Sequence, residues 1–523
     1  MALEHQINRL SSEGKGLDRA GLLVACYELA LDFLNPIRAV VEPAALYRNF
    51  AIAAEALEAE LPWKEFDLWS VPDSFWTELQ RLNSEHSPEL LIRAALGALD
   101  ASLELAGVRH LAPHVVESSF FHQLGYWVIP RDPTCPSWPA VPLTGLSPLG
   151  WISRVRILPC RHDGVLFRLA ELEHELDQRL PWGGGAEGFE ALKIAVSSVS
   201  RSIQPSCAVR GSVIRGEKSF SVYSFEEQEG DLEYLDKILR TKVLPTCMDQ
   251  DAAILILPEL TVSPGLRERL STALRQREKI RALEAPGSPP RPVLVVAGSY
   301  HESDAKGRVV NRSVVLDYRG LPAGLSVPFE ERLLWCHDKV APFLFETGQL
   351  FVGNGGRDES STREVLETFA RGMGLRAEGI AGGIEPEGLG QSFTVVNSRI
   401  GQVSVAICID YLEHCKSWHD KVQGAWVDWV WVPAATTRVS DFMQVARDLA
   451  IQGTGTVAAN ACWLCEAFQA WKDQWAGLAH LPGNLGRWQG TGSRTVPATS
   501  LCPAGGCSGE GCLFVFSLTP PAG

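Results

Sequence analysis

The chain has 523 residues, of which 46% are hydrophobic and 21% are charged, and its formal net charge is −14. A chain of this length usually exceeds one hydrophobic core, so we expect two domains without long disordered regions. The acidic balance argues against a protein that coats nucleic acid or binds anionic membranes. Neither a membrane span nor a signal-peptide pattern is evident, which predicts a cytoplasmic protein with reduced thiols.

Residues 1–185 are predicted to form a mostly α-helical domain. Apolar residues recur at helical spacing across 18–34, and Ser87 followed by Pro88 has the form of a helix start. Residues 164–180 are also expected to be helical. The Pro-rich stretch 127–150 is predicted to be a loop, and the three glycines at 183–185 are the expected linker between the domains.

Residues 186–523 have a different rhythm, in which short β-branched runs alternate with helical stretches. This alternation predicts an α/β domain. The expected strands are 192–196, 252–257, 292–298, 308–316, 393–396, 403–407, 429–432, 456–459 and 513–516. The expected helices are 231–245, 264–284 and 441–452. Residues 353–392 form a Gly-rich, acidic insert that contains a short helical piece near 362–372.

Three segments carry a polar residue at or near the end of an apolar or strand-like run. Glu259 follows a strand stopped by Pro258, Lys339 lies in an apolar segment that contains Pro342, and Cys408 ends the run 401–407. Each motif alone fits a solvated carboxylate, a surface lysine or a buried cysteine. Together they supply a base, a stabiliser of negative charge and a nucleophile, which is what a reactive thiol requires.

These segments resemble the signature segments of the carbon–nitrogen hydrolase superfamily, which includes nitrilases, aliphatic amidases, carbamoylases and the glutaminase domain of NAD synthetases. The order Glu259, Lys339, Cys408 matches, with separations of 80 and 69 residues. The resemblance extends over roughly residues 190–518. Flanking segments in the expected order are 296–299 with 311–316, 393–401, 441–460, and 490–493 with 511–516.

The resemblance implies a four-layer α-β-β-α nitrilase-like sandwich after the helical domain, and a hydrolase of non-peptide amide or nitrile bonds. Cys408 is then the nucleophile and Glu259 the general base, while Lys339 and the N–H of Ile409 stabilise the negative charge. Glu346 is expected to orient the lysine or assist proton transfer. No metal or organic cofactor is implied. The implied partners are a small-molecule substrate and a second copy of the chain.

The sequence departs from the family pattern at three positions, and the first strand of the family fold is either 192–196 or a segment nearer Phe220. Ile409 follows the cysteine where relatives often carry an aromatic residue or Gly, and Tyr411 comes two positions later; both are expected to contact substrate. Glu346 lies seven residues after Lys339, a slightly short spacing, and Gln452 replaces a frequent Glu. These departures leave the identity of the substrate open.

Other interpretations carry less weight. Cys462 and Cys465 form a CxxC pair and three further cysteines stand at 502, 507 and 512, but these are not the paired knuckles of a zinc site. A Cys–His dyad has candidate histidines near Lys339 and after Cys408, yet nothing else fits that mechanism. The alternative function is a nitrilase-like sensor or binding module in a stress or defence system, with the N-terminal domain contacting a protein partner.

Overall fold

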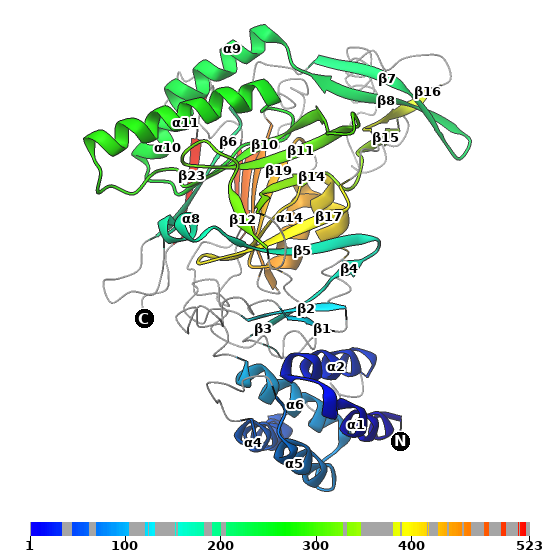
Figure 1. Ribbon diagram of the computed structural model, residues 1–523. Helices are drawn as coiled ribbons and strands as arrows, with labels where there is room; N and C mark the ends of the chain where they lie inside the picture. Colours follow the sequence, from blue (N-terminus) through cyan, green and yellow to red (C-terminus); the bar gives the residue numbers. More distant parts are fainter. Residues whose placement is uncertain are drawn as a thin grey trace.

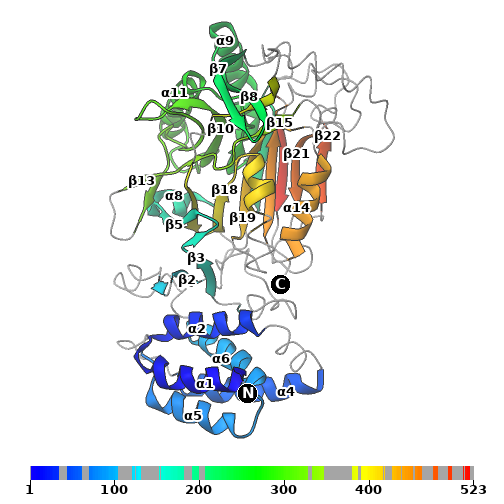
Figure 2. The same cartoon turned by 90° about the vertical axis from the view of Figure 1, so that its right-hand side faces the viewer.

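The N-terminal helices stand apart from a larger body built on β-sheets (Figures 1 and 2). The computed structural model describes residues 2–33, 44–61, 70–103, 121–123, 125–130, 152, 155–181, 191–199, 206–327, 332–346, 380–386, 390–415, 417, 427–436, 439–451, 454–461, 475–480, 493–497, 511 and 513–518. Several predicted features lie outside these residues, namely the linker 183–185, the helical piece 362–372, Gln452, and the cysteines at 462, 465, 502, 507 and 512.

The α-helices that the structure describes in the N-terminal region pack around a shared core, where a mostly helical structure was expected. Asp18 caps the helix that begins at Arg19 by accepting the N–H of Gly21 at 2.7 Å. Ser87 caps the helix that begins at Pro88 by accepting the N–H of Leu90. The cap predicted at Ser87 is therefore present. The helices are α1 (Ala2–Glu13), α2 (Arg19–Asp32), α4 (Ala44–Ala59), α5 (Asp73–Asn83) and α6 (Pro88–Ser102).

A three-stranded sheet joins the helices to the larger body. Its strands are β1 (Phe121–Gln123), β2 (Tyr126–Pro130) and β3 (Val155–Pro159). Successive side chains of a strand point to opposite faces, so Val128 packs into the helical core while Ile129 packs into the body. Arg156 of β3 also forms a buried ion pair with Asp428 of the body. The N-terminal part of the predicted loop 127–150 is thus a strand.

The helix predicted for 164–180 is wrong over its first half. The structure has β4 (Arg161–His162), β5 (Val165–Leu172) and only a short helix, α8 (His174–Arg179). Burial in β5 alternates by strand period, because Val165 and Phe167 face one core and Leu172 the other. Since β5 pairs with β17 (Ser392–Ser398), the chain joins the main body by residue 165 and not after residue 185.

Two large sheets form the main body. The six-stranded sheet has the order β14 (Cys336–Asp338), β11 (Val309–Asp317), β10 (Leu294–Ser303), β9 (Ile254–Ile256), β6 (Leu192–Ser197) and β23 (Leu513–Leu518). The ten-stranded sheet, in which β4 pairs with β5, continues in the order β13 (Leu333–Leu334), β12 (Gly324–Ser326), β5, β17, β18 (Gly401–Val405), β19 (Trp429–Ala434), β20 (Gly455–Asn460), β21 (Trp475–His480) and β22 (Ser493–Pro497). Every strand predicted after residue 190 overlaps one of these.

The two large sheets pack face to face, with helices on their outer faces (Figure 2). Between the sheets, Trp335 stacks on Trp431 with ring centroids 5.6 Å apart. On the six-stranded sheet lie α9 (Glu229–Ile238), a π-helical turn (Leu239–Val243), α10 (Leu244–Asp249) and α11 (Pro264–Glu284). On the ten-stranded sheet lies α14 (Val439–Ile451). The fold is therefore of the α/β class, as predicted, and no helix among the described residues is long and apolar enough to cross a membrane.

A four-stranded sheet of order β15-β16-β8-β7 was not predicted from the sequence. Its strands are β7 (Ser206–Arg215), β8 (Lys218–Glu226), β15 (Leu344–Glu346) and β16 (Ile380–Ile384). The β7–β8 hairpin projects from the body in Figure 1. Phe220, a possible position for the first strand of the family fold, lies in this hairpin, whereas 192–196 forms β6 of the main body.

Candidate active site

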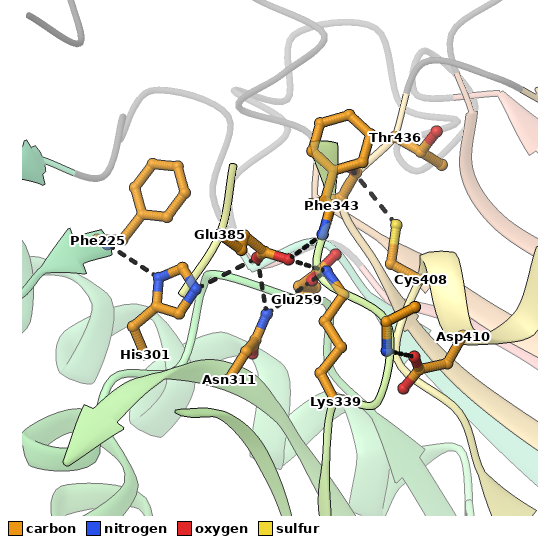
Figure 3. Close-up of polar contacts among 12 residues, drawn as sticks. Phe225, Glu259, His301, Asn311, Lys339, Phe343, Glu385, Cys408, Asp410 and Thr436 are labelled. Atoms are coloured by element: carbon orange, nitrogen blue, oxygen red, sulfur yellow. Dashed lines mark hydrogen bonds and ion pairs between the residues drawn. The ribbon is translucent and has the colours of Figure 1, made fainter. Parts of the chain in front are cut away.

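Polar side chains from three sheets converge at one place (Figure 3). Glu259 follows β9 and Lys339 follows β14 in the six-stranded sheet, while Cys408 follows β18 in the ten-stranded sheet. Glu385 follows β16 of the four-stranded sheet. The structure thus brings together the three residues singled out from the sequence and adds a second carboxylate to them.

A close approach of two backbones holds Glu259. Glu259 forms a bridge with Ser299, and the N–H of Leu260 donates to the Ser299 carbonyl at 2.7 Å. Gly298 has a φ of +58°, and a Cβ added there would lie 2.2 Å from the Pro258 carbonyl oxygen. Only glycine fits this position, because it tolerates positive φ and leaves room for the neighbouring backbone. Gly298 therefore allows the backbone of Pro258 and Glu259 to run close beside β10 after β9 has ended.

Lys339 bridges two carboxylates inside the protein. Its Nζ donates to Glu259 Oε1 at 2.7 Å and to Glu385 Oε2 at 2.7 Å, and all three residues are at most 5% exposed. Asn311 of β11 reinforces the bridge, since its Nδ2 lies 2.9 Å from Glu259 Oε1 and 3.2 Å from Glu385 Oε1. The Lys339 backbone N–H donates to the Asn311 carbonyl at 2.8 Å. Two carboxylates therefore share one cation and one amide donor.

The two carboxylates differ in proton affinity. Burial raises the pKa of Glu259, and the Glu385 charge raises it further although Lys339 opposes both. Burial alone would also raise the pKa of Glu385, but Lys339 and His301 hold it well below its usual range. Burial tends to lower the pKa of Lys339, yet the two carboxylates raise it above its ordinary value. At neutral pH Lys339 and Glu385 are a fixed ion pair, and Glu259 is the carboxylate with the greater proton affinity.

Cys408 stands at a sharp turn between strand and helix. It has a φ of +44°, a left-handed conformation that is costly for a residue with a side chain. Its Sγ lies 3.9 Å from the Ala435 carbonyl oxygen and also interacts with the Glu259 carboxylate. Burial and the Glu259 charge raise the pKa of the Cys408 thiol well above its ordinary value. The resting thiol is therefore protonated.

Asp410 ties the cysteine turn to the lysine segment. Its carboxylate, which is fully buried, accepts the N–H of Val340 at 3.0 Å and the N–H of Ala341 at 2.7 Å. The same carboxylate lies 2.9 Å from His337 Nε2. Because Asp410 comes two residues after Cys408 and Val340 directly follows Lys339, these bonds fix the spacing between the Cys408 turn and the Lys339 segment.

No known family and no curated protein matches the chain by sequence. Solved structures of an amidase from Nesterenkonia sp. resemble it weakly. One structure of that amidase has 15% identity and a TM-score of 0.31, and the match covers 63% of this chain and 90% of that one. The same values apply to a variant of the amidase from strain AN1 with the acetamide moiety of fluoroacetamide added covalently at its active-site cysteine.

A third structure, of a Cys-to-Ser variant, is described as an AN1 amidase from the nitrilase superfamily. It has 15% identity and a TM-score of 0.29, with coverage of 59% of this chain and 93% of that one. These neighbours belong to the class that the sequence resembles. Similarity at this level decides neither the fold nor the activity of this chain, so both depend on its own residues.

The remaining predicted site residues lie in different surroundings. Ile409 is half-buried and begins the helical turn after Cys408, where backbone N–H groups lack intrahelical partners. Tyr411 is fully buried in the core, where it stacks on Phe442 and its hydroxyl lies 2.9 Å from Thr456 Oγ1. A tyrosine with no exposed surface supports the turn from behind and offers nothing to a substrate, so the expected contact does not fit this position. The backbone of Glu346 ends β15 and its side chain is outside the described residues.

Three residues of the cluster were missed from the sequence. Glu385 lies near the end of the insert 353–392. The only sequence signal for it was that a short apolar run ends at a Glu next to a Pro, because Pro386 follows Glu385 much as Pro258 precedes Glu259. Asn311 was noted only as part of a hairpin. His301 lies in β10, where alternation alone does not distinguish a buried functional histidine from a packed one. The second carboxylate beside Lys339 is therefore Glu385, in the place where Glu346 was expected.

Proposed function

We propose that this protein is a nitrilase-like carbon–nitrogen hydrolase that cleaves amide bonds of small molecules through an acyl-enzyme on Cys408. The observation that carries the proposal is Lys339, whose Nζ lies 2.7 Å from both Glu259 and Glu385 beside a buried thiol. Such a cluster supplies a base, a fixed cation and a nucleophile at one point. The helix–sheet–sheet–helix layering supports the nitrilase-like assignment.

The first half of the reaction forms a thioester. Glu259 takes the proton of the Cys408 thiol, and the thiolate attacks the amide carbonyl carbon. Lys339 and the N–H of Ile409 stabilise the negative charge on the carbonyl oxygen. Glu259, now protonated, gives its proton to the amide nitrogen as the C–N bond breaks. The amine leaves, and the acyl group remains on the sulfur.

The second half releases the acid. Glu259 takes a proton from a water molecule, whose oxygen attacks the thioester carbonyl, and the same donors stabilise the second oxyanion. The C–S bond breaks and the thiolate recovers a proton from Glu259. The sum is amide plus water to carboxylic acid plus amine. Because each C–N cleavage needs a proton for the leaving nitrogen, the raised pKa of Glu259 suits an amide substrate.

In this proposal Glu385 is not the base but the permanent counter-charge of Lys339. Its Oε2 accepts from Lys339 and from the Phe343 N–H at 2.8 Å, so it keeps the lysine in place throughout the cycle. We also infer that the sandwich pairs with a second copy of the chain, as the family resemblance implies. A protein partner for the N-terminal helices belongs to the alternative function, the sensor or binding module.

Replacement of the nucleophile tests the function. Cys408→Ala and Cys408→Ser should lower ammonia release from a panel of small primary amides and nitriles by several powers of ten. The matched control is Cys415→Ala, since Cys415 is a buried cysteine seven positions later with a pKa also raised by burial. Mass spectrometry of the wild-type Cys408 peptide should reveal an acyl adduct.

Unchanged hydrolysis in Cys408→Ala would contradict the proposal. A panel in which the wild-type protein binds amides but releases no ammonia and forms no adduct would favour the binding-module alternative instead. Loss of activity in Cys415→Ala alone would mean that the wrong cysteine of this turn has been assigned.

A further inference from the structure

His301 lies beneath the second carboxylate and takes no part in the reaction described above. Its Nε2 is 3.2 Å from Glu385 Oε1, and both side chains are almost wholly buried. Its Nδ1 accepts the backbone N–H of Phe225 at 2.9 Å. Figure 3 shows the imidazole between Phe225 of the four-stranded sheet and the Glu385 carboxylate.

The contacts with Phe225 fix both the orientation and the tautomer of His301. A nitrogen that accepts a backbone N–H carries no proton, so the ring proton is on Nε2, the nitrogen that lies 3.2 Å from Glu385 Oε1. The Phe225 ring stacks on the imidazole with an interplanar angle of 2° and ring centroids 5.6 Å apart, which holds the plane of the ring. His301 therefore presents a defined N–H to the carboxylate.

The donors around the two carboxylates are unequal. Glu259 and Glu385 share Lys339 and Asn311. Glu385 additionally receives the Phe343 N–H on one oxygen and faces His301 with the other. Hydrogen bonds to a charged carboxylate favour its charged form. The additional donors therefore favour negative charge on Glu385 and leave Glu259 as the group that accepts a proton.

Resting on the function proposed above, we propose that His301 is a positioning residue that holds Glu385 as the permanent counter-charge of Lys339, so that Glu259 alone acts as the base. His301 acts through Glu385 and does not touch the reacting atoms. Without its N–H, Glu385 and with it Lys339 would lose a fixed position beside Cys408. A purely structural alternative is that His301 only secures the Phe225 N–H of β8.

Two amide substitutions separate these roles. In His301→Gln the terminal amide reaches the position of Nε2, so a donor to Glu385 is kept while the acceptor for Phe225 is lost. In His301→Asn the shorter side chain reaches only the position of Nδ1, so the acceptor for Phe225 is kept and the donor to Glu385 is lost. The two variants therefore differ in which of the two contacts they keep, whereas their side chains have nearly the same polarity.

The readout is the rate at which iodoacetamide alkylates Cys408, followed by the mass of the Cys408 peptide. This probe needs the thiolate and no knowledge of the natural substrate. We expect His301→Asn to react at least about tenfold more slowly than His301→Gln at neutral pH, the size of one lost charge-assisted hydrogen bond. In a Glu385→Gln background the difference between the two variants should disappear, because the contact that distinguishes them is gone.

The inference is overturned if His301→Gln is the slower variant, if the two are equal, or if their difference persists with Glu385→Gln. It is also overturned if neither variant folds, since His301 would then be a structural residue of the hairpin. Failure here leaves the function intact as long as Cys408→Ala abolishes amide hydrolysis. Hydrolysis that survives Cys408→Ala would instead remove the function, whatever the order of the histidine variants.

Discussion

The two large sheets and the four-stranded sheet contribute differently to the site. Glu259, Lys339 and Cys408 follow strands of the large sheets, in or beside the cores of the body. The four-stranded sheet contributes Glu385, and its β7 strand exposes apolar side chains such as Ile214, which is 74% exposed. In the proposed mechanism the reacting groups are thus carried by a packed scaffold, while a more exposed sheet supplies the charge that sets their protonation. This difference predicts that changes on the large-sheet side affect stability and activity together.

The largest effect on stability is expected from Lys339→Met. This change leaves two buried carboxylates without their shared cation, which should destabilise the protein by roughly 3–5 kcal/mol. It also removes an oxyanion donor, so kcat/KM on the best amide of the panel should fall at least about 10²-fold. Urea unfolding and ammonia release measure the two effects.

The double variant Glu259→Gln/Lys339→Met is the control for the first effect. It replaces one of the two uncompensated carboxylates by a neutral amide, so we expect part of the lost stability to return while activity stays absent. If the single and double variants were equally stable, the charge imbalance could not be the cause of the destabilisation.

The next prediction concerns Glu385, which the four-stranded sheet contributes, and the pH dependence of kcat/KM. The Glu385 charge raises the pKa of Glu259, so Glu385→Gln should lower that pKa. The base form of Glu259 then persists to lower pH, and the acid limb of kcat/KM moves down. The maximum rate should fall about tenfold because Lys339 loses one anchor. Glu346→Gln is the comparison, and a larger shift from it than from Glu385→Gln would return the role to Glu346.

The same division explains what could be predicted from the sequence. The strands of the large sheets are short apolar runs bounded by Gly and Pro, so the pattern located their ends, and the family resemblance then singled out Glu259 and Cys408 there. β16, with the sequence Ile-Ala-Gly-Gly-Ile, carries two glycines and lies inside a Gly-rich insert. Its sequence therefore does not indicate a strand, and Glu385 at its end was not found. β5 was mistaken for a helix because apolar residues on both faces of a strand imitate helical spacing over eight residues.

Contacts between segments far apart in the chain could not be predicted from local sequence patterns. Asp410 joins the cysteine turn to a segment 69 and 70 residues earlier, and His301 meets the amide of Phe225 across 76 residues. Each of these side chains has an ordinary local sequence, and its role depends on which strand lies beside it. Sequence resemblance supplied the order of the reacting residues, whereas the groups that position them follow from sheet pairing.

The last comparison is between two glycines with nearly equal conformations. Gly298, beside Glu259, has a φ of +58°, and Gly216, in the turn of the β7–β8 hairpin, has a φ of +61°. Alanine should cost about 1–2 kcal/mol at both positions for the left-handed backbone. Gly298→Ala carries an additional cost of roughly 1–3 kcal/mol, because its Cβ would meet the Pro258 carbonyl, whereas nothing lies within 4 Å at Gly216. Only Gly298→Ala should also slow amide hydrolysis, since it displaces the backbone that carries Glu259. Equal losses of stability and activity in the two variants would mean that the backbone around Gly298 can accept a Cβ without moving Glu259. The position of Glu259 would then depend less on the packing of the large sheets than the structure implies.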